Sequence, residues 1–310
     1  MARSRMVLLL LLGATVLHAA PVGTLDVDPP ARLIQGEPAR VTVRYDGDEQ
    51  LRRVEVAIID PEGIRRGQSD AVYVAFTDGS AIWQALVAVP TLAEIGDWQI
   101  RVRAQDSRLG MESYHEVPVV EGEFAEMRVR LGRELTALMT EPDPRRARES
   151  RELRELLSES NPNAVFHLDR FELPLEPRRI SAGFGDRRIY EYADGSERRS
   201  AHHGIDYAAD TGTPVFAAGR GAVRLAAERV LSGNSVIIEH LPGIYSLYYH
   251  LDEVSVEKGQ LIETGGKIGV VGMTGLATGP HLHWEVRVGG VAVDPDWFLE
   301  NAPLAVEPRQ

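Results

Sequence analysis

The chain has 310 residues, a formal net charge of -12 and no cysteine. This length allows more than one domain, and a hydrophobic content of 44% is sufficient for packed cores. The acidic balance argues against a general polyanion-binding protein, so we expect no nucleic-acid partner. Without cysteine, the chain forms no disulfide and carries no lipid on a cysteine side chain.

Residues 1–20 have the layout of a secretory signal peptide. Arg3 and Arg5 precede an apolar run, and small residues follow it at Ala19 and Ala20. The run is too short to span a bilayer, which needs about 20 apolar residues. We therefore expect an exported protein of the periplasm or cell envelope, with no stable membrane anchor once the signal is cleaved.

Residues 21–121 have the pattern of a β-sandwich. Short runs of apolar residues, several of them at every second position, are separated by turn-forming clusters such as residues 46–48 and 60–63. Six or seven strands at this spacing predict an immunoglobulin-like fold. No catalytic constellation occurs in this segment. Its predicted role is a spacer, the wall of a groove, or a surface that binds a partner or glycan.

Residues 122–170 are predicted to form a helical, charged linker. Apolar residues between Phe124 and Leu138 give a broken helical stripe, which the prolines Pro142 and Pro144 end. The residues from there to Leu157 mix arginine with glutamate, as a solvated helix does. Two interpretations stay open, a linker between domains and an arm that covers a functional site.

Residues 171–302 are predicted to form an antiparallel β-domain, followed by a tail at residues 303–310. Alternating patterns at residues 215–217 and 236–238 indicate strands, and frequent glycines mark the turns between them. None of these glycines follows the strand-to-helix layout of a nucleotide-binding loop. The whole chain is therefore expected to be mainly β.

Two short motifs in this β-domain combine histidine with aspartate. On a strand, His281 and His283 would share one face about 6.6 Å apart, which suits one metal ligand and one helper. On a straight strand, His202 and Asp206 would lie about 13 Å apart, too far for one ion. We therefore expect the chain to bend at Gly204, which lies between them.

Together the motifs predict one zinc site with an open catalytic position. Zinc binds imidazole nitrogen and carboxylate oxygen, and hydrolytic sites use three protein ligands so that water fills the fourth place. Another histidine, His250, ends a tyrosine-rich strand pattern. His203 would point to the opposite side of an extended chain and is predicted to be structural. His240 ends an apolar run and is predicted to lie at a strand end or turn.

Residues 178–298 resemble the LytM/lysostaphin-type zinc metallopeptidases, which cut peptide bonds of bacterial peptidoglycan. The resemblance rests on four blocks in the same order: RISAGFGDR at 179–187, HHGID at 202–206, YHL at 249–251 and TGLATGPHLHWE at 274–285. One departure is Ser246, where the family usually has threonine; the hydroxyl is kept.

The resemblance implies a role for five residues. The zinc ligands would be His202, Asp206 and His283, holding one zinc ion per chain, and the catalytic residues would be His250 and His281. Bound zinc lowers the pKa of a water ligand to about 7. We assign His281 to take the proton of that water. His250 would donate a hydrogen bond to the oxyanion or protonate the leaving amine, and the two roles can be exchanged.

Two further features have alternative interpretations. Glu285 is two positions after His283 on the same strand face, where it would act as an extra base, orient an imidazole or be solvated. In some members of the family an upstream asparagine occupies the open zinc position and keeps the enzyme latent. Asn161, Asn163 and His167 lie just before this domain and are candidates for the role, through an amide oxygen or an imidazole, although Asn-Pro-Asn is also an ordinary turn.

The predicted architecture is thus a β-sandwich, a short helical linker and a C-terminal antiparallel β metallopeptidase domain. The predicted function is zinc-dependent hydrolysis of peptide bonds in peptidoglycan stem peptides or cross-bridges. The alternative is a non-catalytic envelope protein that binds peptidoglycan or activates a separate cell-wall amidase, because some members of the family have lost ligands. The five intact positions favour the enzyme, and the sequence identifies no protein partner.

Overall fold

The structure is a computed structural model that describes residues 23–47, 51–105, 110–176 and 179–305. The predicted signal peptide at residues 1–20 lies outside these ranges, as do the last five residues of the predicted tail. The described part is mainly β, which confirms the predicted fold class. None of its helices combines the length and the apolar character that crossing a membrane would require.

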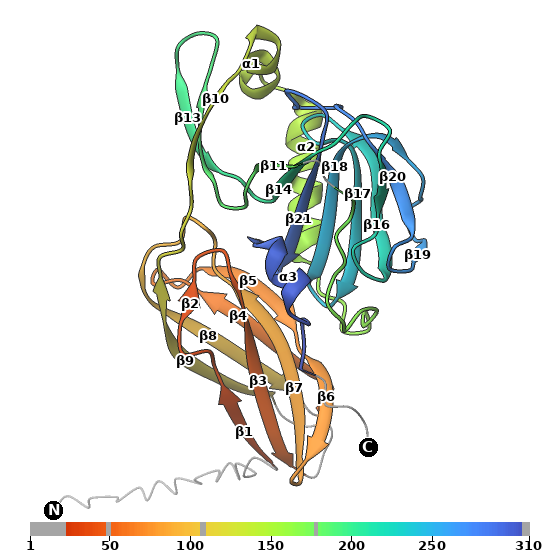
Figure 1. Cartoon of the computed structure of the whole chain (residues 1–310). Coiled ribbons are helices and arrows are strands. Elements are labelled where there is room, and N and C mark those ends of the chain that lie inside the picture. The colour runs from red at the N-terminus through yellow and green to blue at the C-terminus, as the bar shows by residue number, and fades with distance from the viewer. Residues whose placement is uncertain (1–22, 48–50, 106–109, 177–178, 306–310) are drawn as a thin grey trace, which may run out of the picture.

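Two β-sheets form the N-terminal lobe, which lies at the bottom of Figure 1. In the first sheet the strand order is β1-β3-β7-β6, and in the second it is β2-β9-β8-β4-β5. The strands are β1 (Gly23–Asp28), β2 (Leu33–Ile34), β3 (Pro38–Gly47), β4 (Arg53–Ile59), β5 (Arg65–Asp70), β6 (Val72–Thr77), β7 (Ser80–Ala88), β8 (Gly96–Gln105) and β9 (Gly110–Val120).

Residues at alternate positions of both sheets build the core of this sandwich. Val41 and Val43 of β3 meet Val56 of β4 and Ile100 of β8 in one buried cluster. The described lobe has nine strands rather than the predicted six or seven, partly because strands such as the polar β5 (RRGQSD) lack an apolar alternation. The assignment of the sandwich as immunoglobulin-like stays a prediction.

A three-stranded sheet and two helices follow the sandwich. The sheet has the order β10-β12-β13, and the elements are β10 (Glu126–Arg130), β12 (Arg187–Glu191), β13 (Glu197–Ala201), α1 (Arg133–Thr140) and α2 (Pro144–Ser158). The helical prediction is wrong for residues 126–130. Met127 and Val129 alternate with arginines, and this strand pairs in parallel with β12.

The two helices lie where the sequence predicts helical structure. The Asp143 side chain accepts hydrogen bonds from the backbone N–H groups of Arg145 and Arg146, and Pro144 takes the first helical position. An aspartate cap followed by proline is a strong start for a helix, because the cap satisfies free N–H groups and proline has none to satisfy. Helix α1 ends at Thr140, just before Pro142 and Pro144, as the sequence predicts.

The C-terminal lobe is built on one ten-stranded sheet, whose longest path runs β11-β14-β21-β18-β17-β16-β19. The elements are β11 (Arg179–Ala182), β14 (Ile205–Ala208), β15 (Pro214–Phe216), β16 (Gly221–Arg229), β17 (Gly233–Leu241), β18 (Ile244–Val254), β19 (Leu261–Ile262), β20 (Lys267–Val271), β21 (His281–Val288), β22 (Val291–Val293) and α3 (Pro295–Glu300). All pairings within this sheet are antiparallel, as predicted.

The two lobes share a hydrophobic core. Leu86 and Ala88 of β7 belong to the same buried cluster as Val291 of β22. The chain after α3 returns to the sandwich, where Leu304 is buried and the Ala305 N–H donates to Gln84 Oε1 at 2.8 Å. Because the lobes share this core, the structure does not establish that either lobe folds alone. The domain boundaries at residues 121, 171 and 302 stay predictions.

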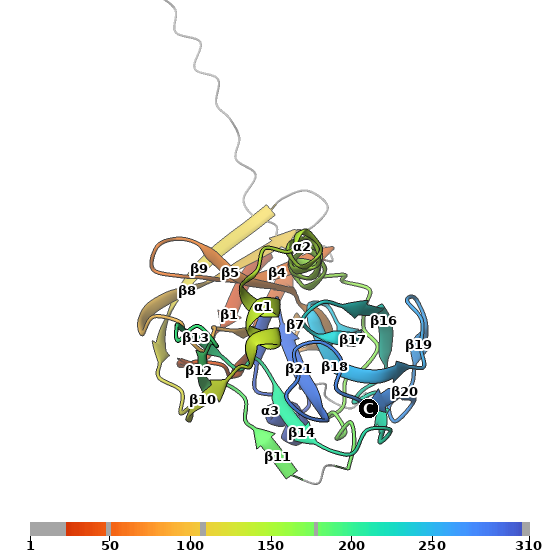
Figure 2. The same cartoon turned by 90° about the horizontal axis from the view of Figure 1, so that it is seen from above.

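Helix α2 packs against one face of the large sheet; it is seen behind β21 and β18 in Figure 1 and end-on in Figure 2. Leu157 is 4% exposed and lies in a cluster with Ile237, Tyr245 and Leu247. Beyond the end of α2, Arg224 of β16 bridges the carboxylates of Glu159 and Glu239. This helix therefore covers apolar residues of the C-terminal lobe, which a freely solvated linker would leave exposed.

We predict that Leu157→Ala lowers the free energy of unfolding by about 2–5 kcal/mol, because it leaves a cavity between α2 and the sheet. Leu173→Ala is the matched control, since Leu173 is 37% exposed, and it should change stability by less than about 0.5 kcal/mol. Urea unfolding of both variants, followed by circular dichroism, measures the difference. Equal stability of the two variants would contradict the packing described for α2.

Candidate metal centre

The pairing of β14 with β21 brings the two histidine motifs together. Asp206 lies opposite His283 and Ala208 lies opposite His281. On its other edge, β21 pairs with β18, where Tyr249 lies opposite His283. Residues directly opposite each other on paired strands have side chains on the same face, so Asp206 and His283 meet there.

Gly204 lies in a bend just before β14, which confirms the bend expected between His202 and Asp206. Its backbone is not in the left-handed region that favours glycine. A Cβ atom at this position would lie 2.2 Å from the Trp284 carbonyl oxygen. Glycine is therefore required because the backbone of β21 passes directly against it, which lets His202 approach the strand.

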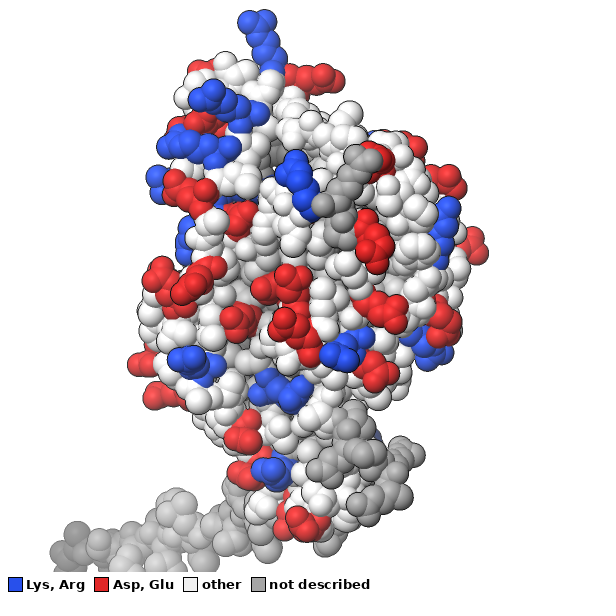
Figure 3. Space-filling model, viewed as in Figure 1, with Lys and Arg blue, Asp and Glu red and all other residues white. Residues whose placement is uncertain are grey.

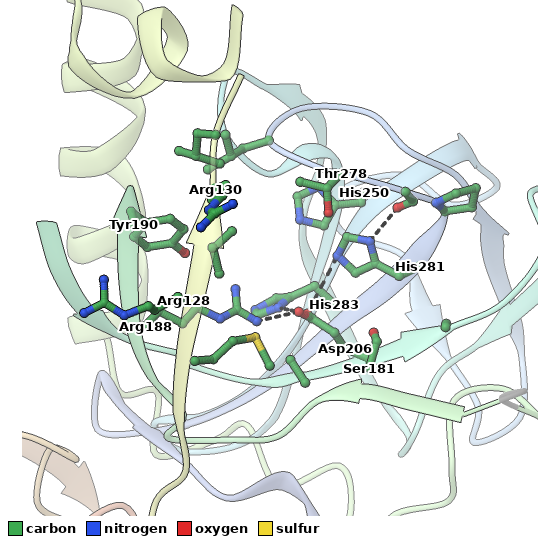
Figure 4. Close-up of a pocket in the computed structure, with 18 of the residues that line it drawn as sticks. Arg128, Arg130, Ser181, Arg188, Tyr190, Asp206, His250, Thr278, His281 and His283 are labelled. Carbon is green, nitrogen blue, oxygen red and sulfur yellow. Dashed lines mark hydrogen bonds and ion pairs between the residues drawn. The ribbon is translucent and has the colours of Figure 1, made fainter. Parts of the chain in front are cut away.

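Three buried side chains, those of His202, Asp206 and His283, converge on one point. Figure 4 labels two of them, Asp206 and His283. His202 Nε2 lies 3.1 Å from Asp206 Oδ1 and 3.0 Å from His283 Nδ1. Asp206 Oδ1 and His283 Nδ1 are 2.7 Å apart. One possible ligand atom from each residue lies within 4.8 Å of the others, so the group could hold a metal ion. Two imidazole nitrogens and a carboxylate oxygen are donors that zinc accepts.

The outward nitrogen of each of these two imidazoles has its own hydrogen-bond acceptor. His202 Nδ1 donates to the Gly183 carbonyl oxygen at 2.6 Å, and His283 Nε2 donates to Glu285 Oε1 at 2.9 Å. Glu285 is held in turn by Arg287, whose Nε donates to Oε2 at 2.7 Å. Such partners fix the orientation of metal-binding histidines. Of the interpretations open for Glu285, its position favours orientation of His283.

The electrostatics of the cluster favour a positive charge at its centre. Burial disfavours the ionised form of Asp206, but hydrogen bonds from His202 and His283 outweigh it and hold the pKa of this carboxyl below its usual range. Burial lowers the pKa of His283, yet its hydrogen bonds to Asp206 and Glu285 raise this pKa to about 9. A metal ion bound here would replace the proton on His283.

His250 and His281 lie next to this group, with ring centroids 4.7 Å apart. His250 Nδ1 donates to the Thr274 carbonyl oxygen and His281 Nδ1 to that of Gly279, each at 2.8 Å. The Nε2 of His281 lies 3.7 Å from Asp206 Oδ1. Burial lowers the pKa of His250 to about 3, so this ring is neutral at neutral pH. His250 also has a φ of 62°, a strained conformation typical of functional sites.

A cavity of about 550 Å³ opens beside the cluster, and four of the five residues, all but His202, line it. One wall consists of residues of β10 and β12, and the opposite wall of the segment before β21 (Figure 4). The lining residues are Met127, Arg128, Val129, Arg130, Leu131, Arg179, Ser181, Ala182, Arg188, Tyr190, Asp206, Ala208, His250, Leu276, Thr278, Gly279, Pro280, His281 and His283. Of the two interpretations of the linker, an arm beside the site agrees better with this wall.

The sequence motifs do not identify the residues of this wall. Arg188 follows directly after the RISAGFGDR block, and its Nη2 donates to Asp206 Oδ2 at 2.6 Å. Tyr190 lies two positions further along β12. The alternation of Met127 and Val129 is the one local signal that could have identified the strand. On the face in Figure 3, basic side chains gather over this three-stranded sheet, although the chain is acidic overall.

His203, His240 and the two asparagines do not belong to the group of possible metal ligands. His203 is exposed, and His240 is buried at the end of β17, where its Nδ1 donates to the Arg220 carbonyl oxygen. The strand-end prediction for His240 is therefore confirmed. Neither Asn161 nor Asn163 lines the cavity. Of the two interpretations of this segment, the ordinary turn agrees better with the structure, in which the Asn163 N–H donates to Asn161 Oδ1 at 3.0 Å.

Comparisons with known proteins agree on the C-terminal lobe. Residues 200–295 match the model of Peptidase family M23. Peptidoglycan DD-endopeptidase ShyC of Vibrio cholerae is 39% identical over 122 residues, which cover 39% of this chain and 28% of that protein. DD-carboxypeptidase/endopeptidase Mpg of Neisseria meningitidis is 42% identical over 122 residues, covering 39% and 27%. The chain spans less than a third of the length of either relative.

A solved structure extends the likeness to both lobes. The crystal structure of a putative peptidase M23 from Pseudomonas aeruginosa covers 88% of this chain and 96% of its own, with a TM-score of 0.59 and 23% identity. This likeness establishes a common fold. The segment matched to the family model contains all five residues of the candidate centre. Residues 200–295 of this chain, which hold the candidate metal centre, are therefore similar to peptidase family M23.

Proposed function

We propose that this protein is a zinc-dependent endopeptidase that hydrolyses peptide bonds of bacterial peptidoglycan, in stem peptides or cross-bridges. The observation that carries the proposal is the convergence of His202, Asp206 and His283 on one point beside a cavity that also contains His250 and His281. The similarity to ShyC, a peptidoglycan DD-endopeptidase, supports the same class of substrate. Such a substrate lies in the cell envelope, which agrees with the predicted export.

The three convergent residues would hold one zinc ion through His202 Nε2, Asp206 Oδ1 and His283 Nδ1. This donor set suits zinc, because two neutral imidazoles and one carboxylate leave a fourth position open. When bound there, zinc would lower the pKa of a water molecule and polarise the scissile carbonyl. Glu285 would keep the ring of His283 in its metal-binding orientation through the hydrogen bond to Nε2.

His250 and His281 would handle the protons of the reaction. In each ring the Nδ1–H donates a hydrogen bond to a backbone carbonyl oxygen, so in the neutral ring Nε2 carries a lone pair. One of them accepts a proton from the attacking water, and the other stabilises the oxyanion or returns a proton to the leaving amine. We assign the role of base to His281, because its Nε2 lies 3.7 Å from Asp206 Oδ1, the oxygen that would bind the metal.

The metal ligands generate the first prediction from this proposal. His202→Ala, Asp206→Ala and His283→Ala should each reduce the zinc content of the purified full chain from about one ion to nearly none, because each removes one of three protein ligands. His203→Ala is the matched control and should keep its zinc, since His203 lies outside the cluster. Elemental analysis by mass spectrometry measures the content. Stoichiometric zinc in any ligand variant would disprove that assignment.

The second prediction separates catalysis from metal binding. His281→Ala and His250→Ala should retain zinc yet cleave purified peptidoglycan about 100-fold or more slowly, because each removes a proton-handling group. Mass spectrometry of the released fragments identifies the new amine and hence the bond that is cut. Loss of zinc from His281→Ala would contradict its role. Peptidoglycan binding by the wild-type protein with no new amine would favour the non-catalytic alternative.

A further inference from the structure

The three-stranded sheet β10-β12-β13 contributes one side chain to the metal centre, and this residue lies outside the segment that matches the family model. Arg188 of β12 precedes residues 200–295, and its Nη2 donates to Asp206 Oδ2 at 2.6 Å. The two side chains are only 15% and 11% exposed. Separating a charged pair with so little solvent contact is costly, because one oxygen of the buried carboxylate would lose its hydrogen-bond donor.

The two oxygens of Asp206 have different partners. Oδ1 faces His202 and His283, and it is the atom that would bind the metal. Oδ2 accepts the hydrogen bond from Arg188, and no other side chain in the described ranges donates to it. A carboxylate rotates about its last side-chain bond unless both ends are held. The hydrogen bond from Arg188 therefore restricts the rotation of the Asp206 carboxylate.

The guanidinium of Arg188 is presented by a sheet that has its own cross-strand ties. In the register of the sheet Arg188 lies between Met127 of β10 and Ser200 of β13. On the same sheet, Arg128 Nη1 bonds Glu191 at 2.8 Å and Glu197 at 2.9 Å, so one side chain connects all three strands. Arg188 thus lies on the central strand of this sheet, at the wall of the cavity.

We propose that Arg188 is a positioning residue of the metal centre, which holds Asp206 Oδ2 so that Oδ1 is presented to the ion. The inference rests on the proposed zinc site and adds a residue that contacts neither the ion nor the reacting atoms. Hydrogen-bond partners of metal ligands typically contribute 10- to 100-fold to metal affinity. The effect of Arg188 should therefore appear in zinc affinity, even before any substrate is added.

A competing role for Arg188 makes a different prediction. The same residue lines the cavity, so a substrate carboxylate could take the place of Asp206 as its partner. Arginine binds carboxylates in general, and that role would raise KM for an acidic peptide. It would leave the zinc affinity of the free protein unchanged. The two roles are thus distinguished by a measurement made without substrate.

The test uses the full chain freed of metal with a chelator and titrated with zinc against a competing indicator. Arg188→Met should weaken zinc binding by about 10- to 100-fold, and Arg188→Lys, which keeps a cationic donor, should stay within about tenfold of the wild type. Arg199→Met is the matched control, because Arg199 is an exposed arginine on the neighbouring strand β13. It should bind zinc as the wild type does.

Equal zinc affinity of Arg188→Met and the wild type overturns the inference, as does a rise in KM without a change in affinity. Circular dichroism establishes whether the Met variant is folded. If it is not, Arg188→Gln replaces it, and unchanged affinity in that variant is equally decisive. The wild-type titration comes first: absence of zinc binding there overturns the proposed function itself, whereas wild-type binding with unaffected variants overturns the role of Arg188 alone.

Discussion

The register between β14 and β21 is the constraint on which the centre depends. Asp206 faces His283 only while Tyr207 faces Leu282, and a slip of one residue would turn every side chain of the strand to the other face. The alternate residues prevent such a slip, because Tyr207, Leu282 and Trp284 are buried in the main core of the C-terminal lobe. In each strand the buried apolar face thus fixes the position of the polar residues on the opposite face.

Charge compensation then organises the surroundings of this pair of strands. A chain of contacts runs from Arg287 through Glu285, His283 and Asp206 to Arg188, alternating in sign wherever two charged groups meet. Buried charges are costly unless each has a partner, so the members depend on one another. The network also connects the large sheet with the three-stranded sheet, whose strands lie on the opposite side of the cavity.

The sequence predicts what depends on local pattern and fails where distant partners decide. The ligand motifs, the bend at Gly204 and helix α2 follow from short-range spacing, capping and proline placement. The strand β10 does not, because its partner β12 lies about sixty residues further along the chain and local periodicity cannot identify a partner. The contact of Arg188 with Asp206 depends on this distant pairing. The core shared by the two lobes cannot be predicted from the sequence of either lobe alone, because its residues come from both.

The separation of β14 from β21 along the chain determines when the centre can form. These adjacent strands are joined by β15 to β20, and the wall strand β10 must likewise wait for β12. Strands so far apart in the sequence pair slowly, because closing the long loop between them costs entropy before any contact between the strands stabilises the chain. A growing chain has no complete set of donor atoms until β21 has been synthesised and docked. The chemistry of the centre is therefore delayed by topology alone until folding is nearly complete.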